Sequence, residues 1–87
     1  MKLNVENVAR VISGELYRLV FFYKGREFRL DSQMMGESEH LVISDSRGRI
    51  VYTEMVLVYE MFAKEGAPFE SWSSFLDHHI ETHQILV

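Results

Sequence analysis

The chain has 87 residues, no cysteine and a net charge of −4, from nine basic and thirteen acidic side chains. A chain of this length predicts a single domain, residues 1–87, near the lower size at which one hydrophobic core is sufficient. The lack of cysteine excludes disulfides, thiolate catalysis and sulfur-ligated zinc. No apolar run approaches the roughly 20 residues of a membrane span, and the first ten residues lack the apolar segment of a signal peptide. We therefore expect a cytoplasmic protein without membrane contact.

The charges are unevenly distributed along the chain. Residues 1–49 carry eight basic and seven acidic side chains, a balance of +1, whereas residues 50–87 carry one basic and six acidic side chains, a balance of −5. Because phosphate backbones attract basic surfaces, the C-terminal half is disfavoured as a nucleic-acid partner.

The first predicted element is a short amphipathic helix from Asn4 to Ser13. Its apolar residues recur with helical spacing, Asn4 suits the N-cap, and Gly14 suits the left-handed residue past the end. The apolar positions are Val5, Val8, Ala9 and Ile12.

The stretch from Leu16 to Asp31 predicts a β-hairpin whose two-residue turn is Lys24-Gly25. That turn fixes a register in which Tyr23 lies opposite Arg26, Phe21 opposite Phe28 and Leu19 opposite Leu30. Tyr17, Leu19, Phe21, Phe28 and Leu30 then face the core, and Arg18, Val20, Phe22 and Arg29 occupy the other face.

A loop around Gly36, residues 32–38, is expected to lead into a second hairpin. Its strands, residues 40–44 and 49–52, flank Asp45-Ser46-Arg47-Gly48, in which Asp first and Gly fourth are typical of a type I turn. The apolar run that follows predicts a helix from Thr53 or Glu54 to Lys64 or Glu65, buried on most sides and ended by Gly66. A strand continuing from Ile50 to Val58 is the alternative, because apolar periodicity does not separate the two.

A last helix is predicted from about Phe69 to His83, with Pro68 in its first turn. The predicted fold is α+β: a small antiparallel sheet of two hairpins and three or four strands, with an N-terminal helix and two C-terminal helices packed on one face.

Three of the four histidines lie at the end of this helix, and His79 and His83 are one turn apart on the same face. Two metal-binding imidazoles use that spacing. However, Glu81 and Asp77 fall on the opposite side, so Glu81 cannot serve as the base of a helical zinc motif. A site would also need a third ligand from elsewhere, and the sequence does not bring His40, at the start of a predicted strand, near the pair. We interpret His79 and His83 as half-buried, hydrogen-bonded residues, and keep a weak metal site and a pH-dependent interface as alternatives.

No other constellation predicts catalysis. The serines lack a nucleophile elbow, and the glycines stand alone in separate turns rather than in a phosphate-binding loop. The carboxylates near the predicted loops are interpreted as solvated charge. They are Asp31, Glu37, Glu39 and Asp45. No catalytic residue and no cofactor is expected.

The most suggestive surface combines arginines with exposed apolar residues on or beside the hairpins. Such a mixture is typical of protein contact surfaces, and with a positive net field it would favour nucleic acid. The predicted partner-binding residues are Arg18, Val20, Phe22, Arg29, Arg47 and Arg49. The apolar end, Ile85 to Val87, predicts a further helical turn or a strand added to a sheet edge.

We recognise no family signature in these residues. The sequence favours a small non-enzymatic protein-binding module, regulatory or inhibitory, of the kind found among accessory proteins of phages and mobile elements. That origin rests on analogy of size, acidity and fold class. A homodimer is one form of this hypothesis. The alternatives are a nucleic-acid-binding protein that uses the hairpin arginines and a small metal protein or enzyme that uses His79 and His83.

Overall fold

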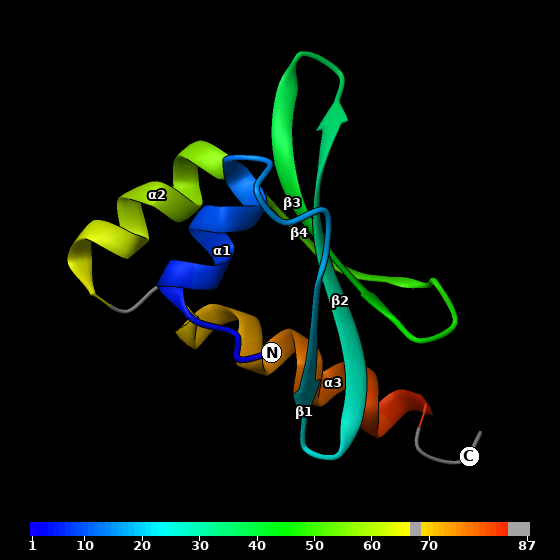
Figure 1. The fold of residues 1–87 in the computed structure, drawn as a ribbon. Coiled ribbons are helices and arrows are strands. Elements are labelled where there is room, and N and C mark those ends of the chain that lie inside the picture. Colours follow the sequence, from blue (N-terminus) through cyan, green and yellow to red (C-terminus); the bar gives the residue numbers. More distant parts are fainter. Residues whose placement is uncertain (67–68, 84–87) are drawn as a thin grey trace.

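The computed structural model describes residues 1–66 and 69–83 and confirms the α+β prediction. The elements in chain order are α1 (Val5–Ile12), β1 (Leu19–Tyr23), β2 (Arg26–Met35), β3 (Ser38–Asp45), β4 (Ile50–Met55), α2 (Val56–Glu65) and α3 (Glu70–His83) (Figure 1). Pro68 and the terminal segment Ile85 to Val87, on which two of the predictions depend, lie outside the described residues.

The strands form one antiparallel sheet in the order β1-β2-β3-β4, so the chain meanders from each strand to its neighbour. The predicted register of the first hairpin is confirmed: Tyr23 pairs with Arg26, Phe21 with Phe28 and Leu19 with Leu30. Lys24 and Gly25 both have positive φ angles, which is the geometry that a two-residue hairpin turn requires.

The predicted loop over residues 32–38 is wrong. β2 continues to Met35, β3 already begins at Ser38, and the two strands pair up to Met35 opposite Ser38. A tight turn through Gly36, at φ 69°, makes this possible. The hydrogen-bonded ladder between β2 and β3 extends here beyond the hydrophobic core. Strand side chains in this part are mainly polar, so the sequence shows no apolar alternation that would have predicted the strands.

The boundary between β4 and α2 differs from both predictions. The strand ends at Met55 and the helix begins at Val56, later than the predicted Thr53 or Glu54 and before Val58. Glu54 stays in the strand, opposite Leu41, and its side chain accepts a hydrogen bond from Trp72 Nε1 at 2.8 Å. The end of α2 at Glu65 and the left-handed Gly66 are as predicted.

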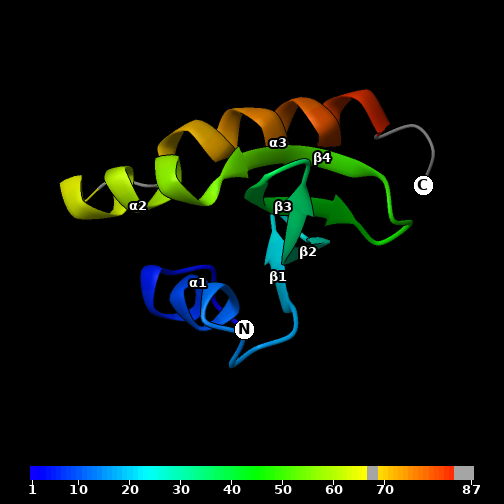
Figure 2. The same ribbon diagram turned by 90° about the horizontal axis from the view of Figure 1, so that it is seen from above.

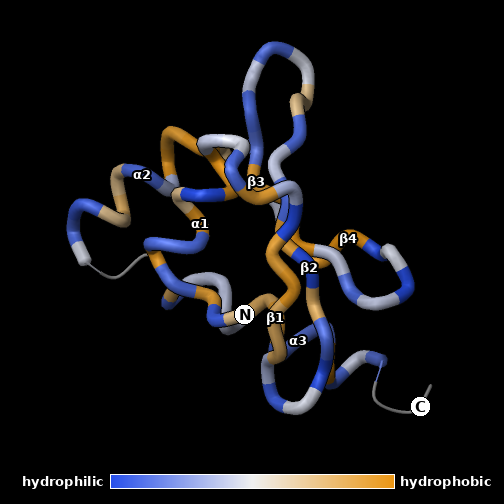
Figure 3. Tube along the Cα trace, in the orientation of Figure 1, coloured by the Kyte–Doolittle hydropathy of each residue, from blue (hydrophilic) through white to orange (hydrophobic). Residues whose placement is uncertain are grey.

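The core lies between the sheet and the helices. Figures 1 and 2 show how the three helices are arranged around the sheet. Each of α1, α2 and α3 contributes two buried side chains to the core, and the strands contribute alternate residues. Figure 3 shows apolar segments along β1 and through the middle of the sheet, whereas the β2–β3 turn is mainly polar. The buried members of the core are Val8, Val11, Leu19, Phe21, Phe28, Leu30, Leu41, Ile43, Val56, Tyr59, Trp72 and Leu76.

Both ends of α1 follow the prediction. Asn4 Oδ1 accepts a hydrogen bond from the Asn7 backbone N–H at 2.8 Å, and Gly14 has a φ of 83°. One side-chain prediction is wrong. Tyr17 is 86% exposed rather than in the core, because β1 begins only at Leu19. Asp77 of α3 accepts a hydrogen bond from Tyr23 Oη at 2.9 Å and pairs with Lys24 at 2.6 Å, so it connects this helix to the first hairpin. Among the described residues, every helix is too short or too polar to cross a membrane.

Candidate functional sites

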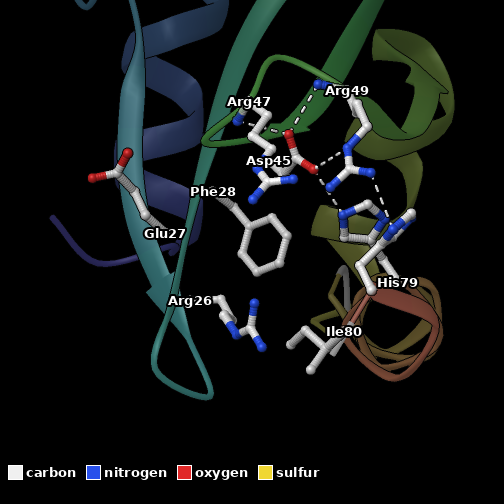
Figure 4. A pocket seen from close by; sticks show the side chains of 9 residues that line it. Arg26, Glu27, Phe28, Asp45, Arg47, Arg49, His79 and Ile80 are labelled. Atoms are coloured by element: carbon white, nitrogen blue, oxygen red, sulfur yellow. Dashed lines mark hydrogen bonds and ion pairs between the residues drawn. The ribbon is translucent and has the colours of Figure 1, made fainter. Parts of the chain in front are cut away.

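A polar cluster forms where the β3–β4 turn meets α3, and Asp45 is at its centre (Figure 4). β3 pairs Asp45 with the core residue Phe28, so the carboxylate points to the helix side of the sheet. The predicted turn is present, with the Gly48 N–H donating to the Asp45 carbonyl at 3.0 Å. Asp45 is only 7% exposed, so its interpretation as solvated loop charge is wrong.

The Asp45 carboxylate is fully engaged by donors. Within the described residues, Oδ1 accepts from the backbone N–H groups of Arg47 and Arg49, both at 2.9 Å, and Oδ2 accepts from Arg49 Nε and His79 Nε2, both at 3.0 Å. Burial alone would raise the pKa of Asp45, but these hydrogen bonds outweigh it and lower the pKa to about 2. The group is therefore a fixed anion that holds the turn against α3.

His79 and His83 belong to this cluster. Both are half-buried and hydrogen-bonded, as the sequence predicted, and their rings lie 4.4 Å apart. Because arginine can only donate, Arg49 Nη1 donates to His83 Nδ1 at 3.0 Å, and neutral His83 carries its proton on Nε2. Burial first and the charge of Arg49 second lower the pKa of His83 below its ordinary value.

The cluster is poorly suited to a metal ion. Asp45 and His83 already accept hydrogen bonds from Arg49, and His79 donates to Asp45. His40 lies in β3 opposite Gln33, where its Nδ1 approaches the Ser38 carbonyl. In residues 1–66 and 69–83, no group of three or more His, Cys, Asp or Glu side chains could hold a metal.

The predicted partner-binding residues lie in two separate places. Val20 and Arg29 are opposite each other on the sheet face away from the helices, and Phe22 is beside them and 70% exposed. Arg29 pairs there with Glu27 at 3.4 Å. Arg18 is exposed next to this face and lies over the Tyr17 ring. Arg49 instead contacts the helix side, and Arg47 belongs to the same turn around Asp45.

An exposed apolar surface lies on α2, and sequence reasoning missed it. The prediction that α2 is buried on most sides is wrong, because only Val56 and Tyr59 of this helix are buried. Four apolar residues on its outer side, which we call the α2 surface, are exposed. They are Leu57 at 69%, Val58, Met61 at 64% and Phe62.

The spacing of residues in α2 contained the signal for this surface. Residues 56, 59 and 63 recur as one helical stripe toward the core, and residues 57, 58, 61 and 62 form a second stripe on the opposite side of the helix. A ten-residue helix at the edge of a small sheet can place only one such stripe against its own core. The second stripe then faces outward.

Acidic residues and an apolar groove border the α2 surface. Glu37, Glu39 and Glu60 line a hollow of about 290 Å³ together with Leu57 and Met55. On the other side of the helix, α1 and α2 enclose a groove of about 340 Å³. Its apolar lining residues are Val5, Ala9, Ile12, Tyr59 and Ala63.

Comparisons with known proteins found no match to any protein-family model, to any curated protein or to any solved structure.

Proposed function

We propose that this chain is a non-enzymatic protein-binding module that docks a different protein on the α2 surface. The supporting observation is that Leu57, Val58, Met61 and Phe62 present one continuous apolar stripe on the outer side of a helix. Contiguous apolar surface that a small protein leaves in water is characteristic of contact sites.

The balance of exposed and buried side chains supports this proposal. Among the described residues, thirteen large apolar side chains are exposed, as many as the thirteen apolar side chains that are buried. A few exposed apolar residues are normal for any protein. What is informative is that four of the exposed side chains lie together on the α2 surface, as expected when a partner covers it.

The charge around the α2 surface supports a heterologous partner. Glu37, Glu39 and Glu60 border it, and Lys64 is the nearby basic residue on the same helix. In a two-fold symmetric dimer the same patch meets itself, so these acids would face the acids of the second copy. A partner with an apolar anchor and a basic rim avoids that repulsion, because its positive charges complement the negative potential of these acids.

A regulatory or inhibitory accessory role in the cytoplasm fits such a module. In that role the consequence of binding would come from covering or holding the partner. The sheet face around Phe22 serves in this proposal as a second contact area, since it is uncovered by α1, α2 and α3.

The test is affinity capture from the native host, with identification of the captured protein by mass spectrometry and measurement of its affinity for the purified chain. Met61→Glu places a charge in the centre of the α2 surface and is expected to weaken capture at least about tenfold. Ser74→Glu is the control, because it adds the same charge at an exposed position of α3, outside that surface and its acidic border.

Both variants change an exposed residue, so their free energies of unfolding should stay within about 0.5 kcal/mol of the parent chain. Equal capture by Met61→Glu and the parent chain would reject the α2 surface. Phe22→Glu tests the sheet face in the same assay, and unchanged capture would remove that face from the proposal.

A further inference from the structure

We propose that β2 binds an extended segment of a partner protein along the edge that β1 leaves open, residues 31–35, which we call the β2 edge. β1 pairs with β2 only as far as Leu19 opposite Leu30, whereas β2 continues to Met35. In Figure 1 this part of β2 projects past β1 together with β3. The β2 edge is separate from the α2 surface, and its role does not depend on the protein docked there.

The alternation of an antiparallel ladder determines which backbone groups of the β2 edge are free. Neighbouring pairs alternate between those that exchange hydrogen bonds and those that do not, and the pair that closes a two-residue turn exchanges them. Tyr23 and Arg26 close the first hairpin, so Leu30 is the last residue of β2 bonded to β1. Ser32 and Met34 continue this series, and their N–H and C=O groups point to the open side. Within the described residues, no hydrogen bond reaches these groups from that side.

The outer edges of the sheet are already accompanied by other parts of the chain. On β1, the Val20 carbonyl accepts a hydrogen bond from the Met1 ammonium group at 3.0 Å. α3 runs alongside β4 (Figure 2), and Trp72 of this helix donates to Glu54 of this strand. Native sheets commonly cover their edges, because unpaired backbone groups recruit other chains. The β2 edge therefore offers an added strand the open position in this sheet, and such addition is a recurring mode of peptide binding.

A groove of about 500 Å³ lies beside the β2 edge, between β2 and the end of α1 with the loop that follows it. That volume is within the usual range of ligand pockets, so the groove has room for side chains of a short strand. Ser32 and Gln33 belong to its β2 wall. Its apolar lining residues are Val11, Ile12 and Leu16.

The register of β2 determines which side chains of an added strand face the groove. Side chains alternate between the two faces of a sheet, and directly opposite residues share a face. Ser32 pairs with the buried core residue Leu41, so Ser32 and Met34 lie on the helix side of the sheet, where α1 also lies. Residues of the added strand opposite Ser32 and Met34 would therefore face the apolar wall, and the residue between them would face away from the helices.

The charge of the groove indicates the chemistry of the segment. Asp31 and Glu39 line the groove, and no basic side chain does so within the described residues. Ser32 Oγ donates to Glu39 Oε2, which holds that carboxylate beside β2. A second copy of the chain would bring the same acids to the edge, whereas a basic segment complements them.

These features together specify an order of residues in the segment. An antiparallel segment passes Met34 before Ser32, so we expect a basic residue, any residue and then an apolar residue. The basic side chain extends toward Glu39, which pairs with Met34 on β3. The apolar side chain packs against Val11 and its neighbours in the groove.

The probe for the experiment is the peptide acetyl-Thr-Lys-Thr-Val-Thr-amide, added to the full chain while NMR follows amide shifts and hydrogen exchange. In the free chain, Ser32 and Met34 should exchange faster than Gln33, whose N–H belongs to the ladder with β3. With peptide at about ten times its dissociation constant, exchange at Ser32 and Met34 should slow roughly tenfold, because only the unbound fraction exchanges. The peptide with Glu in place of Lys should bind at least about threefold more weakly.

Met34→Pro and Met34→Ala form a matched pair of variants. Both remove the thioether side chain, but only proline removes the free N–H, and proline is tolerated where a strand edge donates no ladder bond. Met34→Ala should bind the peptide as the parent chain does, and Met34→Pro should bind it roughly tenfold more weakly. Circular dichroism and urea unfolding establish that both variants are folded.

Glu39→Gln and Glu37→Gln form a second pair that leaves the backbone unchanged. Each removes one negative charge from the same hairpin, but only Glu39 lines the groove beside the β2 edge. Glu39→Gln should therefore weaken binding of the Lys peptide at least about twofold, and Glu37→Gln should leave it unchanged. Met61→Glu on the α2 surface should also leave it unchanged, so failure at one site is distinguishable from failure at the other.

Four outcomes would each overturn the proposal. They are absence of saturable binding up to about 10 mM Lys peptide, equal affinities for the Lys and Glu peptides, equal affinities of Met34→Pro and Met34→Ala, and protected amides located away from residues 31–35. Sedimentation of the chain without peptide tests the other occupant. A dimer that Met34→Pro dissociates and Met34→Ala does not would assign the β2 edge to a second copy and would likewise overturn the proposal.

Discussion

Asp45 shows how one buried carboxylate organises a junction of the fold. A buried charge is costly unless hydrogen bonds replace its water, and Asp45 receives them from its own turn and from α3. The turn alone would supply the backbone donors, as Asp in this position commonly does. The bond to His79 turns a local feature into a contact between distant parts of the chain.

We predict that Asp45→Asn makes the chain less stable at pH 7 by about 2–3 kcal/mol, because the amide cannot accept all of these bonds. The native pKa of Asp45, about 2, lies below its ordinary 3.8. Above pH 3.8 the charged form therefore contributes about 2 kcal/mol, which is lost as the pH falls toward 2. Urea unfolding at several pH values measures this effect. The difference in the free energy of unfolding between Asp45→Asn and the parent chain should shrink as the pH falls from 3.8 to 2.

His83 is expected to cause a second decline in the free energy of unfolding, at a higher pH than the decline caused by Asp45. Its native pKa is below 6.5, so the unfolded chain binds more protons as the pH falls below that value and stability declines. His83→Gln should remove this step and keep the step at lower pH. Asp31→Asn is the control for Asp45→Asn, since Asp31 accepts a bond from Gln33 at an exposed position. A flat profile between pH 6.5 and 2 in the parent chain would contradict both assignments.

At this scale the sequence predicted that His79 and His83 are half-buried, but not what they contact. The partner of His79 lies 34 residues away, and no periodicity connects α3 with the β3–β4 turn. Asp45 was identified as the first residue of its turn, yet its burial depends on where α3 packs. Contacts of this kind follow from the tertiary arrangement and are not encoded in local spacing.

Among the elements, the first hairpin was predictable and the start of α2 was not. Lys24-Gly25 determines the turn, and a two-residue turn determines every pair of β1 and β2. Between Ile50 and Val58 the apolar residues satisfy both helix and strand patterns. In the structure Glu54 belongs to β4 and not to α2. In this position its buried carboxylate accepts hydrogen bonds from Tyr52 and Trp72.

The bond between Glu54 and Trp72 joins β4 to α3, and we predict that it stabilises the fold strongly. Trp72→Phe removes the donor and part of a fully buried ring, with an expected loss of about 2–4 kcal/mol in the free energy of unfolding. Glu54→Gln keeps an acceptor and should cost less.

A double-mutant cycle with these two substitutions, measured by urea unfolding, should give a coupling of about 0.5–3 kcal/mol. Additive effects within about 0.5 kcal/mol would show that the two side chains do not act together. The loss of packing around Trp72 occurs both with and without the Glu54 substitution, so it cancels in the cycle. The coupling energy therefore reports the contact between the two side chains.

For the whole molecule, the α2 surface and the acids around it act in opposite directions on self-association. Burying Leu57 and Met61 against a second copy would be favourable, whereas Glu37, Glu39 and Glu60 would meet their own counterparts. The repulsion depends on ionic strength, because the screening length falls from about 8 Å at 0.15 M salt to about 3 Å at 1 M. Apolar burial is not weakened in this way.

We therefore predict that the isolated chain is a monomer at 0.15 M sodium chloride and micromolar concentration, and self-associates as the salt approaches 1 M. Met61→Glu should prevent this association, while Ser74→Glu on α3 should leave it unchanged. Analytical ultracentrifugation across the salt series measures the mass directly. A dimer that is stable at low salt and weakened by added salt would mean that opposite charges hold two copies together, in which case the acidic border does not select a basic, heterologous partner.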